Sequence, residues 1–189
     1  MLEKYLPLVD RVTDRAELSD LMSDMVGELS ALHIFVRNGD MRTAPDRISI
    51  ASLGADLERD EAAGGWRIKH IYRTDPEYPE DQSPLVRPGV ELEEGDVLLA
   101  FNGVPLLEAG HPGALLANQA GRQMLVQYQR GEEKKEAVVT PMSDSAFDNL
   151  RYSEWEYTRR LAVEQMSDKQ IGYVHLRAMG SANIAEWAR

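Results

Sequence analysis

The chain has 189 residues, of which 43% are hydrophobic, and its 32 acidic and 21 basic side chains give a formal net charge of −11 at pH 7. This composition is enough for a globular core, but the acidic balance argues against nucleic acid as a partner, because such binding rests on clustered Lys and Arg. The absence of cysteine excludes disulfides, thiolate catalysis and cysteine zinc sites, and the longest apolar runs, such as 97–101, are too short for a membrane span or a signal peptide.

The first part of the chain is predicted to be helical. Apolar residues recur at helical spacing from the start, at Leu2, Tyr5, Leu6, Val9 and Val12. A longer helix is expected from Asp14 to His33, where Asp14 and Glu17 supply a cap-like start. Its apolar stripe consists of Leu18, Leu21, Met22, Met25, Val26, Leu29 and Leu32. Asn38-Gly39-Asp40 then signals a turn, followed by polar residues up to Pro45.

Between Arg47 and Met142 the pattern changes to short β segments separated by turns. Alternation predicts strands at 48–50 and 66–72, and further strands are expected as a pair between 88 and 101, at 124–128 and at 137–140. Gly64-Gly65, Asn102-Gly103 and Gly131-Glu132 are the turn signals, and Asn102-Gly103 is the strongest hairpin signal. The acidic, proline-rich residues 75–84 indicate a surface loop, with short helices expected from Ser83-Pro84 and near 112–120.

After Met142 the pattern becomes helical again. Helical spacing continues from Tyr152 to Met166, Ser167-Asp168 ends it, and the apolar residues 171–176 indicate a strand. A last helix is expected to begin behind a Ser or Asn cap near Ser181 and to run to Arg189. A helix, a strand and a helix in this order are typical of the start of an α/β core. Because both ends of the chain are abrupt, we expect it to be a fragment of a longer protein.

The middle segment resembles a PDZ domain of the bacterial protease type. Ser52-Leu53-Gly54-Ala55 is similar to the carboxylate-binding loop of that family, and residues 112–119, with Leu115 and Leu116, are similar to its groove helix. The turn series Pro88-Gly89, Gly95-Asp96 and Asn102-Gly103 occurs in the family's order, with apolar residues between the turns. The resemblance implies that a peptide adds a strand to the sheet edge and places its terminal carboxylate in the loop.

The flanking segments are similar to tricorn proteases of the peptidase S41 group. The similarity lies in residues 27–33 before the PDZ-like segment, and in residues 151–155 and 171–176 after it. It implies an α+β fold with three pieces: a helical first piece of a split catalytic core at 1–45, a PDZ domain at 46–142, and the start of an α/β second piece at 143–189. The PDZ domain is expected as a β-sandwich or partly open barrel of about six strands with one or two helices.

The resemblance implies that His33 is the general base of a serine peptidase. It places the nucleophilic serine and a supporting glutamate beyond residue 189, so the fragment alone is expected to be inactive. Family members often carry a serine directly before this histidine, whereas this chain has Leu32. Without the resemblance, His33 at the end of an apolar stripe is read as a packed structural histidine. His70, His111 and His175 have no partner at catalytic or metal spacing and are interpreted as strand or loop histidines.

Two functions remain open from the sequence. The first is part of a tricorn-like serine peptidase that hydrolyses peptides, and the second is a non-catalytic PDZ-type scaffold that binds peptides. Residues 52–55 form either an anion nest or a plain turn whose groove is closed by its neighbours. No cofactor, metal, nucleic acid or membrane span is expected, and the resemblance allows a homo-oligomer of the full-length protein. The protein is expected to be soluble. The sequence does not decide between the cytoplasm and the periplasm.

Overall fold

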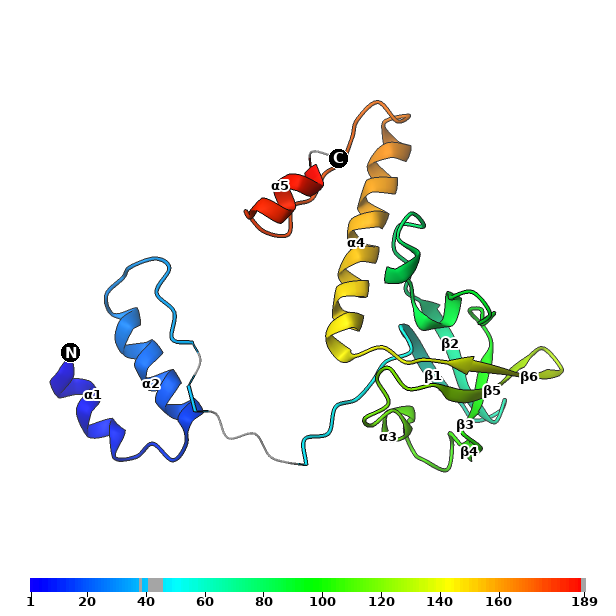
Figure 1. The fold of residues 1–189 in the computed structure, drawn as a ribbon, viewed down its shortest axis with the longest axis horizontal. Helices are drawn as coiled ribbons and strands as arrows, with labels where there is room; N and C mark the ends of the chain where they lie inside the picture. The colour runs from blue at the N-terminus through cyan, green and yellow to red at the C-terminus, as the bar shows by residue number, and fades with distance from the viewer. Residues whose placement is uncertain (38, 41–45, 188–189) are drawn as a thin grey trace. The chain divides into compact units, whose positions relative to one another are not determined.

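The computed structural model describes residues 1–37, 39–40 and 46–187 (Figure 1). It divides the chain into two compact units, Met1–Arg47 and Ile48–Arg189, each of which is described by itself. The expected turn at Asn38 and most of the polar residues up to Pro45 lie outside the described residues, as do the last two residues of the expected C-terminal helix.

The first unit consists of two helices, α1 (Leu2–Val9) and α2 (Arg15–Gly27). Asp14 caps α2 as expected, because its side chain accepts hydrogen bonds from the backbone amides of Ala16 and Glu17. Tyr5 is the buried side chain of α1, and its hydroxyl donates to Glu28 over 2.8 Å. The prediction of one helix as far as His33 is wrong in its length, because α2 ends at Gly27 and a turn at Ser30, with φ +48°, follows.

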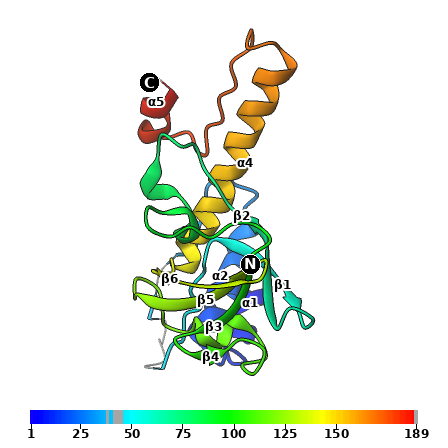
Figure 2. The same ribbon diagram turned by 90° about the vertical axis from the view of Figure 1, so that its right-hand side faces the viewer.

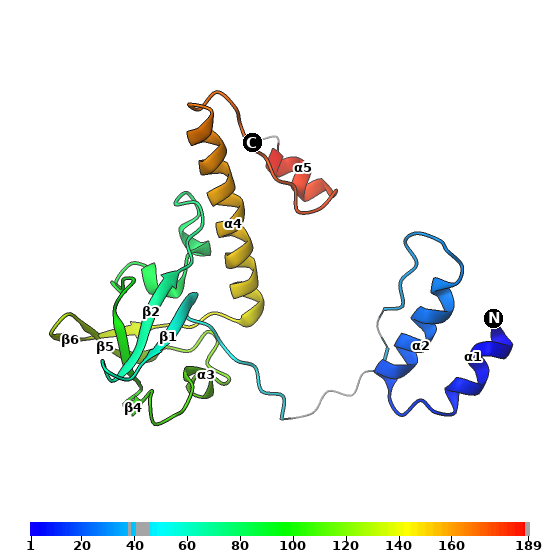
Figure 3. The same ribbon diagram turned by 180° about the vertical axis from the view of Figure 1, so that it is seen from behind.

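The second unit is built on one antiparallel sheet of six strands. The strands are β1 (Ala55–Asp60), β2 (Gly65–Ile71), β3 (Val97–Phe101), β4 (Val104–Pro105), β5 (Met124–Arg130) and β6 (Glu133–Val139). Their order is β1-β2-β3-β5-β6, and β4 pairs with β3, so that β1 and β6 lie at the two ends (Figure 3). The predicted α+β class is confirmed, and the sheet is open rather than a sandwich.

The hairpin turns follow the glycine signals. Gly64, with φ +76°, ends the turn between β1 and β2. Asn102 and Gly103 have φ values of +49° and +81°, the combination that a two-residue hairpin requires, and they join β3 to β4. The Asn102 side chain also accepts a hydrogen bond from the Leu125 amide, so this turn is tied to β5.

The core lies on one face of this sheet. β3 is the central strand, and four of its five residues are buried. Loops and short helices supply Leu53, Leu85, Leu92, Leu106 and Leu116, which pack on it and are at most 5% exposed. Burying each such side chain contributes about 1.5–3 kcal/mol. The connections between strands are therefore part of the core.

Short helices interrupt the connections. Two 3-10 turns, η1 (Pro79–Asp81) and η2 (Pro84–Val86), follow β2, and Ser83 caps η2 as the sequence predicts. The 75–84 loop is not wholly a surface loop, because Asp75 and Ser83 are buried. The helix α3 (Pro112–Leu115) is shorter than the expected 112–119.

The long helix α4 (Asp144–Met166) confirms the predicted helix after Met142. Ser143 caps its start, and Ser167 closes its end through a hydrogen bond from its hydroxyl to the Val163 carbonyl. The first turns of α4 lie beside the sheet of the second unit and beside the 74–86 segment (Figures 1 and 2). Leu150 is its buried residue, whereas Tyr152 and Trp155 of the predicted stripe are each 40% exposed.

Three predicted strands are absent among the described residues. Residues 48–50 form only an isolated bridge from Ile50 to Ala117, the first strand of the pair expected between 88 and 101 does not form, and residues 171–176 form no strand. Most of residues 171–176 are apolar, but their backbone forms no strand with any described segment. Ile171 is 60% exposed. A strand requires a hydrogen-bonded neighbour, which an apolar pattern does not supply. The last helix, α5 (Ser181–Trp187), begins at Ser181 itself, and the Gly180 carbonyl accepts its first bond.

Candidate functional site

His33, the candidate base, lies in a turn six residues after the end of α2. Its φ is +63° and its side chain is exposed. Its ring lies 6.4 Å from the Phe35 ring, and no hydrogen bond to the imidazole is formed by the described residues. A general base must be oriented by a third group. Leu32 beside it is 88% exposed and supplies no such group.

The candidate carboxylate loop, residues 52–55, directly precedes β1. Ser52 exchanges two backbone hydrogen bonds with Met142, both of 2.9 Å. The Gly54 amide donates to the Ser52 hydroxyl oxygen over 3.0 Å, and the Gly54 carbonyl accepts from Tyr72. An anion nest needs amide hydrogens that point into free space. In this loop the amides of Ser52 and Gly54 already have partners within the protein.

The segment that follows β2 fills the space beside this loop. Gly54 has φ +69°, and a Cβ at this position would lie 2.7 Å from the Ser83 hydroxyl oxygen and 3.0 Å from Pro84. The Ser83 hydroxyl donates to the Leu53 carbonyl over 2.9 Å. Only glycine fits here, and the tight fit is made by the domain's own η2 segment.

The two leucines of the candidate groove wall have different surroundings. Leu115 on α3 is half-buried and packs at the border of the core, whereas Leu116 is only 5% exposed and belongs to the core itself. The Leu116 carbonyl accepts a hydrogen bond from Ala51, which fixes the end of α3 beside the start of the loop. Leu115 is therefore accessible to a ligand in part, and Leu116 is not.

The candidate residues are distributed over both units. Ser52, Leu53, Gly54, Ala55, Leu115 and Leu116 belong to the second unit, and His33 belongs to the first. Each candidate is therefore described within its own unit: the exposed His33 after α2, and the loop 52–55 with β1 and α3. Among the described residues, no group of three or more His, Cys, Asp or Glu could hold a metal ion. No helix in this part of the chain is long and apolar enough to cross a membrane.

The other histidines all have hydrogen-bond partners, and those of His70 and His175 lie far away in the sequence. His70 on β2 contacts the carboxylates of Glu94 and Glu154. His111 caps α3 by accepting a hydrogen bond from Gly113, and His175 bonds to the Tyr152 hydroxyl over 2.7 Å. The interpretation of His70 as a strand histidine is correct for its element, but its two partners are 24 and 84 residues away.

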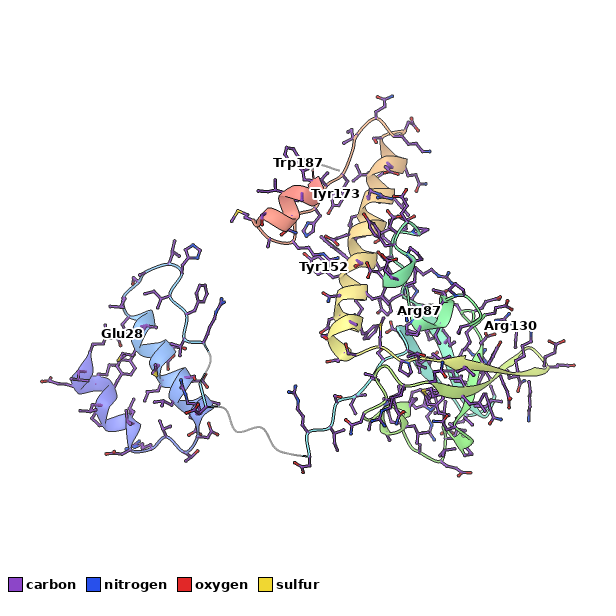
Figure 4. All side chains as sticks on the ribbon, viewed as in Figure 1. Glu28, Arg87, Arg130, Tyr152, Tyr173 and Trp187 are labelled. Atoms are coloured by element: carbon purple, nitrogen blue, oxygen red, sulfur yellow. The ribbon has the colours of Figure 1, made fainter. Side chains whose placement is uncertain are left out.

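A hollow of about 680 Å³ lies along α4, between this helix, the 74–81 loop and the 173–183 segment. Tyr152 points from α4 toward the segment that carries Tyr173 (Figure 4). Two arginines line the hollow, and each is paired with a carboxylate: Arg160 with Asp75 over 2.8 Å, and Arg177 with Glu156.

An open antiparallel sheet, with a glycine turn before an edge strand and a short helix near that edge, is the architecture of a PDZ domain. A family model described as "Tricorn protease PDZ domain" matches residues 51–144, and one described as "Tricorn protease C1 domain" matches residues 1–27. The solved structure titled "Crystal structure of the tricorn protease" shares the fold, with a TM-score of 0.81 at 24% identity over 97% of this chain and 18% of that chain.

Curated relatives agree with the family models. The chain is 35% identical to "Tricorn protease homolog 1" of Streptomyces coelicolor over 98% of its own length, and 32% identical to "Tricorn protease homolog" of Saccharolobus solfataricus over 100%. It spans 17% of the length of each of these relatives. The chain contains a PDZ domain of a peptidase-associated type. It belongs to the tricorn protease family.

Proposed function

We propose that this chain is part of a serine-type peptidase of the S41 group, which hydrolyses peptides with His33 as its general base. The observation that carries the proposal is the order of the family matches: the C1 match ends at residue 27, the PDZ match starts at residue 51, and the exposed His33 lies between them. The resemblance to tricorn proteases implies that the general base lies between these two segments. The division into pieces at 1–45, 46–142 and 143–189 and the assembly into a homo-oligomer are part of the same proposal.

The role of His33 follows from acyl-transfer chemistry. As the hydroxyl oxygen of a serine from outside this chain attacks the peptide carbonyl, a neutral imidazole takes the hydroxyl proton. The imidazolium then gives this proton to the departing amine, and a water molecule later hydrolyses the acyl-enzyme by the same route. Since the nucleophile is expected beyond residue 189, the 189 residues alone should not hydrolyse peptides.

The test uses the full-length parent and a serine-directed fluorophosphonate probe. We expect the probe to label one serine outside residues 1–189, and His33→Ala to abolish the labelling, because the unassisted hydroxyl is a weak nucleophile. His111→Ala is the matched control, since this histidine caps α3 and should not affect labelling. Labelling that is indifferent to His33, or peptidase activity of the isolated 189 residues that depends on His33, would contradict the proposal.

A second candidate function is a PDZ-type scaffold without catalysis. The specific observation in its favour is Leu32, which is exposed beside His33 and places no hydroxyl there to orient the imidazole. In the probe experiment, the complete absence of a labelled serine in the folded parent would support this function over the peptidase.

For the PDZ domain we propose a positioning role in which the loop 52–55 does not capture a free carboxylate. The support is that Ser52 and Gly54 already use their amides within the domain, and that Ser83 and Pro84 fill the space beside Gly54. A peptide that binds would then do so by pairing with the edge strand β1 and by contact with Leu115.

The prediction is that an apolar peptide binds equally well with a free and with an amidated C-terminus. Titration calorimetry on the 189-residue chain measures the ratio of the two Kd values, which should be close to one. A tighter affinity for the free acid by about tenfold, which corresponds to about 1.4 kcal/mol, would show that the loop holds carboxylates and would overturn the positioning role. Leu115→Ala should weaken both peptides alike.

A further inference from the structure

The His70 clasp, which consists of His70, Glu94 and Glu154, joins the PDZ sheet to the helix that follows it. His70 lies on β2, Glu94 in the loop before β3, and Glu154 on α4. The His70 Nδ1 atom is 3.0 Å from a Glu94 oxygen, and its Nε2 atom is 2.9 Å from both Glu154 oxygens. The imidazole therefore bridges two carboxylates that come from different parts of the fold.

This geometry suits only one protonation state of the ring. A neutral imidazole has one N–H donor, and its other nitrogen presents a lone pair. In the clasp that lone pair would face a carboxylate oxygen at about 3 Å, which is repulsive. The imidazolium instead donates at both nitrogens, and each of these hydrogen bonds is assisted by charge.

The two carboxylates are held in place independently of His70. Glu94 accepts a hydrogen bond from the Ile71 amide over 2.9 Å, and Glu154 accepts one from the Arg73 amide over 2.8 Å. Glu154 is the less accessible of the two, with a side chain that is 17% exposed compared with 47% for Glu94. Because the acceptors are fixed, the proton on His70 is the variable part of the clasp.

The other charged and titratable groups around the clasp come from β1, from the residues directly after β2, and from α4. The Tyr72 ring lies edge-on to His70 at 4.8 Å, and its hydroxyl donates to Asp56, the residue that pairs with His70 across β1 and β2. Two cations lie near the clasp. The Arg73 charge favours the ionised form of Glu94, and the Arg151 charge favours the ionised form of Tyr72. Neither forms an ion pair with Glu154 among the described residues.

The helix α4 also contacts the PDZ domain through groups other than His70. The Phe147 and Tyr72 rings pack at 5.3 Å, Leu150 is 2% exposed, and Arg160 pairs with Asp75 further along the helix. The loss of the clasp would therefore loosen the middle of α4 without releasing the helix.

We propose that the His70 clasp is an acid-closed device that fixes α4 on the PDZ domain when His70 is protonated and loosens this helix when His70 loses its proton. The device lies entirely within the second unit and does not depend on the peptidase proposal. Its consequence for a larger protein is that the PDZ domain is held more rigidly against the segment that follows it at low pH than at high pH.

The direction of the effect follows from the surroundings of His70. Burial alone would lower the pKa of His70, but the hydrogen bonds and charges of Glu154 and Glu94 outweigh it and raise this pKa. A histidine with a raised folded-state pKa contributes stability that is fully present below the unfolded value of about 6.5. This contribution is lost as the pH rises through the folded-state pKa of His70.

The experiment is an NMR titration of the ¹³C,¹⁵N-labelled 189-residue chain. We expect the His70 ring to titrate with a midpoint above about 6.5, and Glu154→Gln to lower this midpoint. Asp148→Asn is the matched control, because Asp148 is on the same helix and pairs with Arg151, and it should leave the midpoint in place. In parallel, amide exchange across α4, corrected for the intrinsic effect of pH, should accelerate as His70 deprotonates.

Each outcome decides the proposal. A midpoint at or below about 6.5 in the unmodified chain, or one that Glu154→Gln does not move, would overturn it. So would amide protection in α4 that stays constant while His70 titrates. In His70→Gln, protection in the middle of α4 should no longer respond to pH. If that variant does not fold, the titration of the unmodified chain still decides.

Discussion

At the residue scale, Ser83 shows how one hydroxyl can join two segments of the domain. It is fully buried, donates to the Leu53 carbonyl over 2.9 Å, and accepts from the Leu85 amide at the start of η2. A carbonyl and an amide that are both out of reach of water therefore depend on the same side chain.

Ser83→Ala is expected to destabilise the chain by about 1–3 kcal/mol, because it leaves these buried groups without a partner and removes the cap of η2. Urea unfolding followed by circular dichroism measures this loss. Thr158→Ala, on the exposed side of α4, is the control and should change stability by less than about 0.5 kcal/mol. An equal effect of the two substitutions would mean that the Ser83 hydrogen bonds add nothing.

At the element scale, the close contact between β2 and β3 requires a glycine at the start of β2. Gly65 begins β2, next to the register pair Trp66 and Leu98. A Cβ at Gly65 would lie 2.1 Å from the Leu98 carbonyl oxygen and 2.9 Å from a Val97 methyl carbon. The carbonyl belongs to the central strand and cannot move without disturbing the core.

Gly65→Ala is therefore expected to cost about 3 kcal/mol, at the upper end of the usual penalty for overpacking. The matched control is Gly172→Ala, because a Cβ at Gly172 meets no atom within 4 Å. Guanidinium unfolding of both variants gives the comparison. A Gly65→Ala variant with unchanged stability and an unchanged amide NMR spectrum would show that β3 can move away from β2 with little loss of folding free energy.

The elements also show where sequence patterns are informative. Asn102-Gly103 and Asp14 act through neighbours in the chain, so hairpin and cap could be predicted from local chemistry. The sequence of strand β1, Ala-Asp-Leu-Glu-Arg-Asp, does not predict a strand, because it lacks alternating apolar residues. Its state results from pairing with β2, which no local pattern encodes.

At the scale of the whole molecule, the family could be predicted from the order of turn glycines and flanking helices. The closure of the loop at Gly54 and the clasp at His70 could not. Both depend on contacts across many residues: Ser83 reaches Leu53 from 30 positions away, and Glu154 reaches His70 from 84. The roles of His33 and of the loop 52–55 stay predictions.

The end strand β1 has a consequence for how the protein behaves at high concentration. An unpaired strand edge can join the edge of another molecule, and proteins counter this with charges and irregular backbone. β1 has both, because Asp56, Glu58 and Arg59 are exposed and a bulge lies between Asp56 and Leu57. The charged side chains and the bulge therefore disfavour pairing of two identical copies at this edge. A short flexible peptide, as in the proposed pairing with β1, brings no second charged sheet edge and can adapt to the bulge.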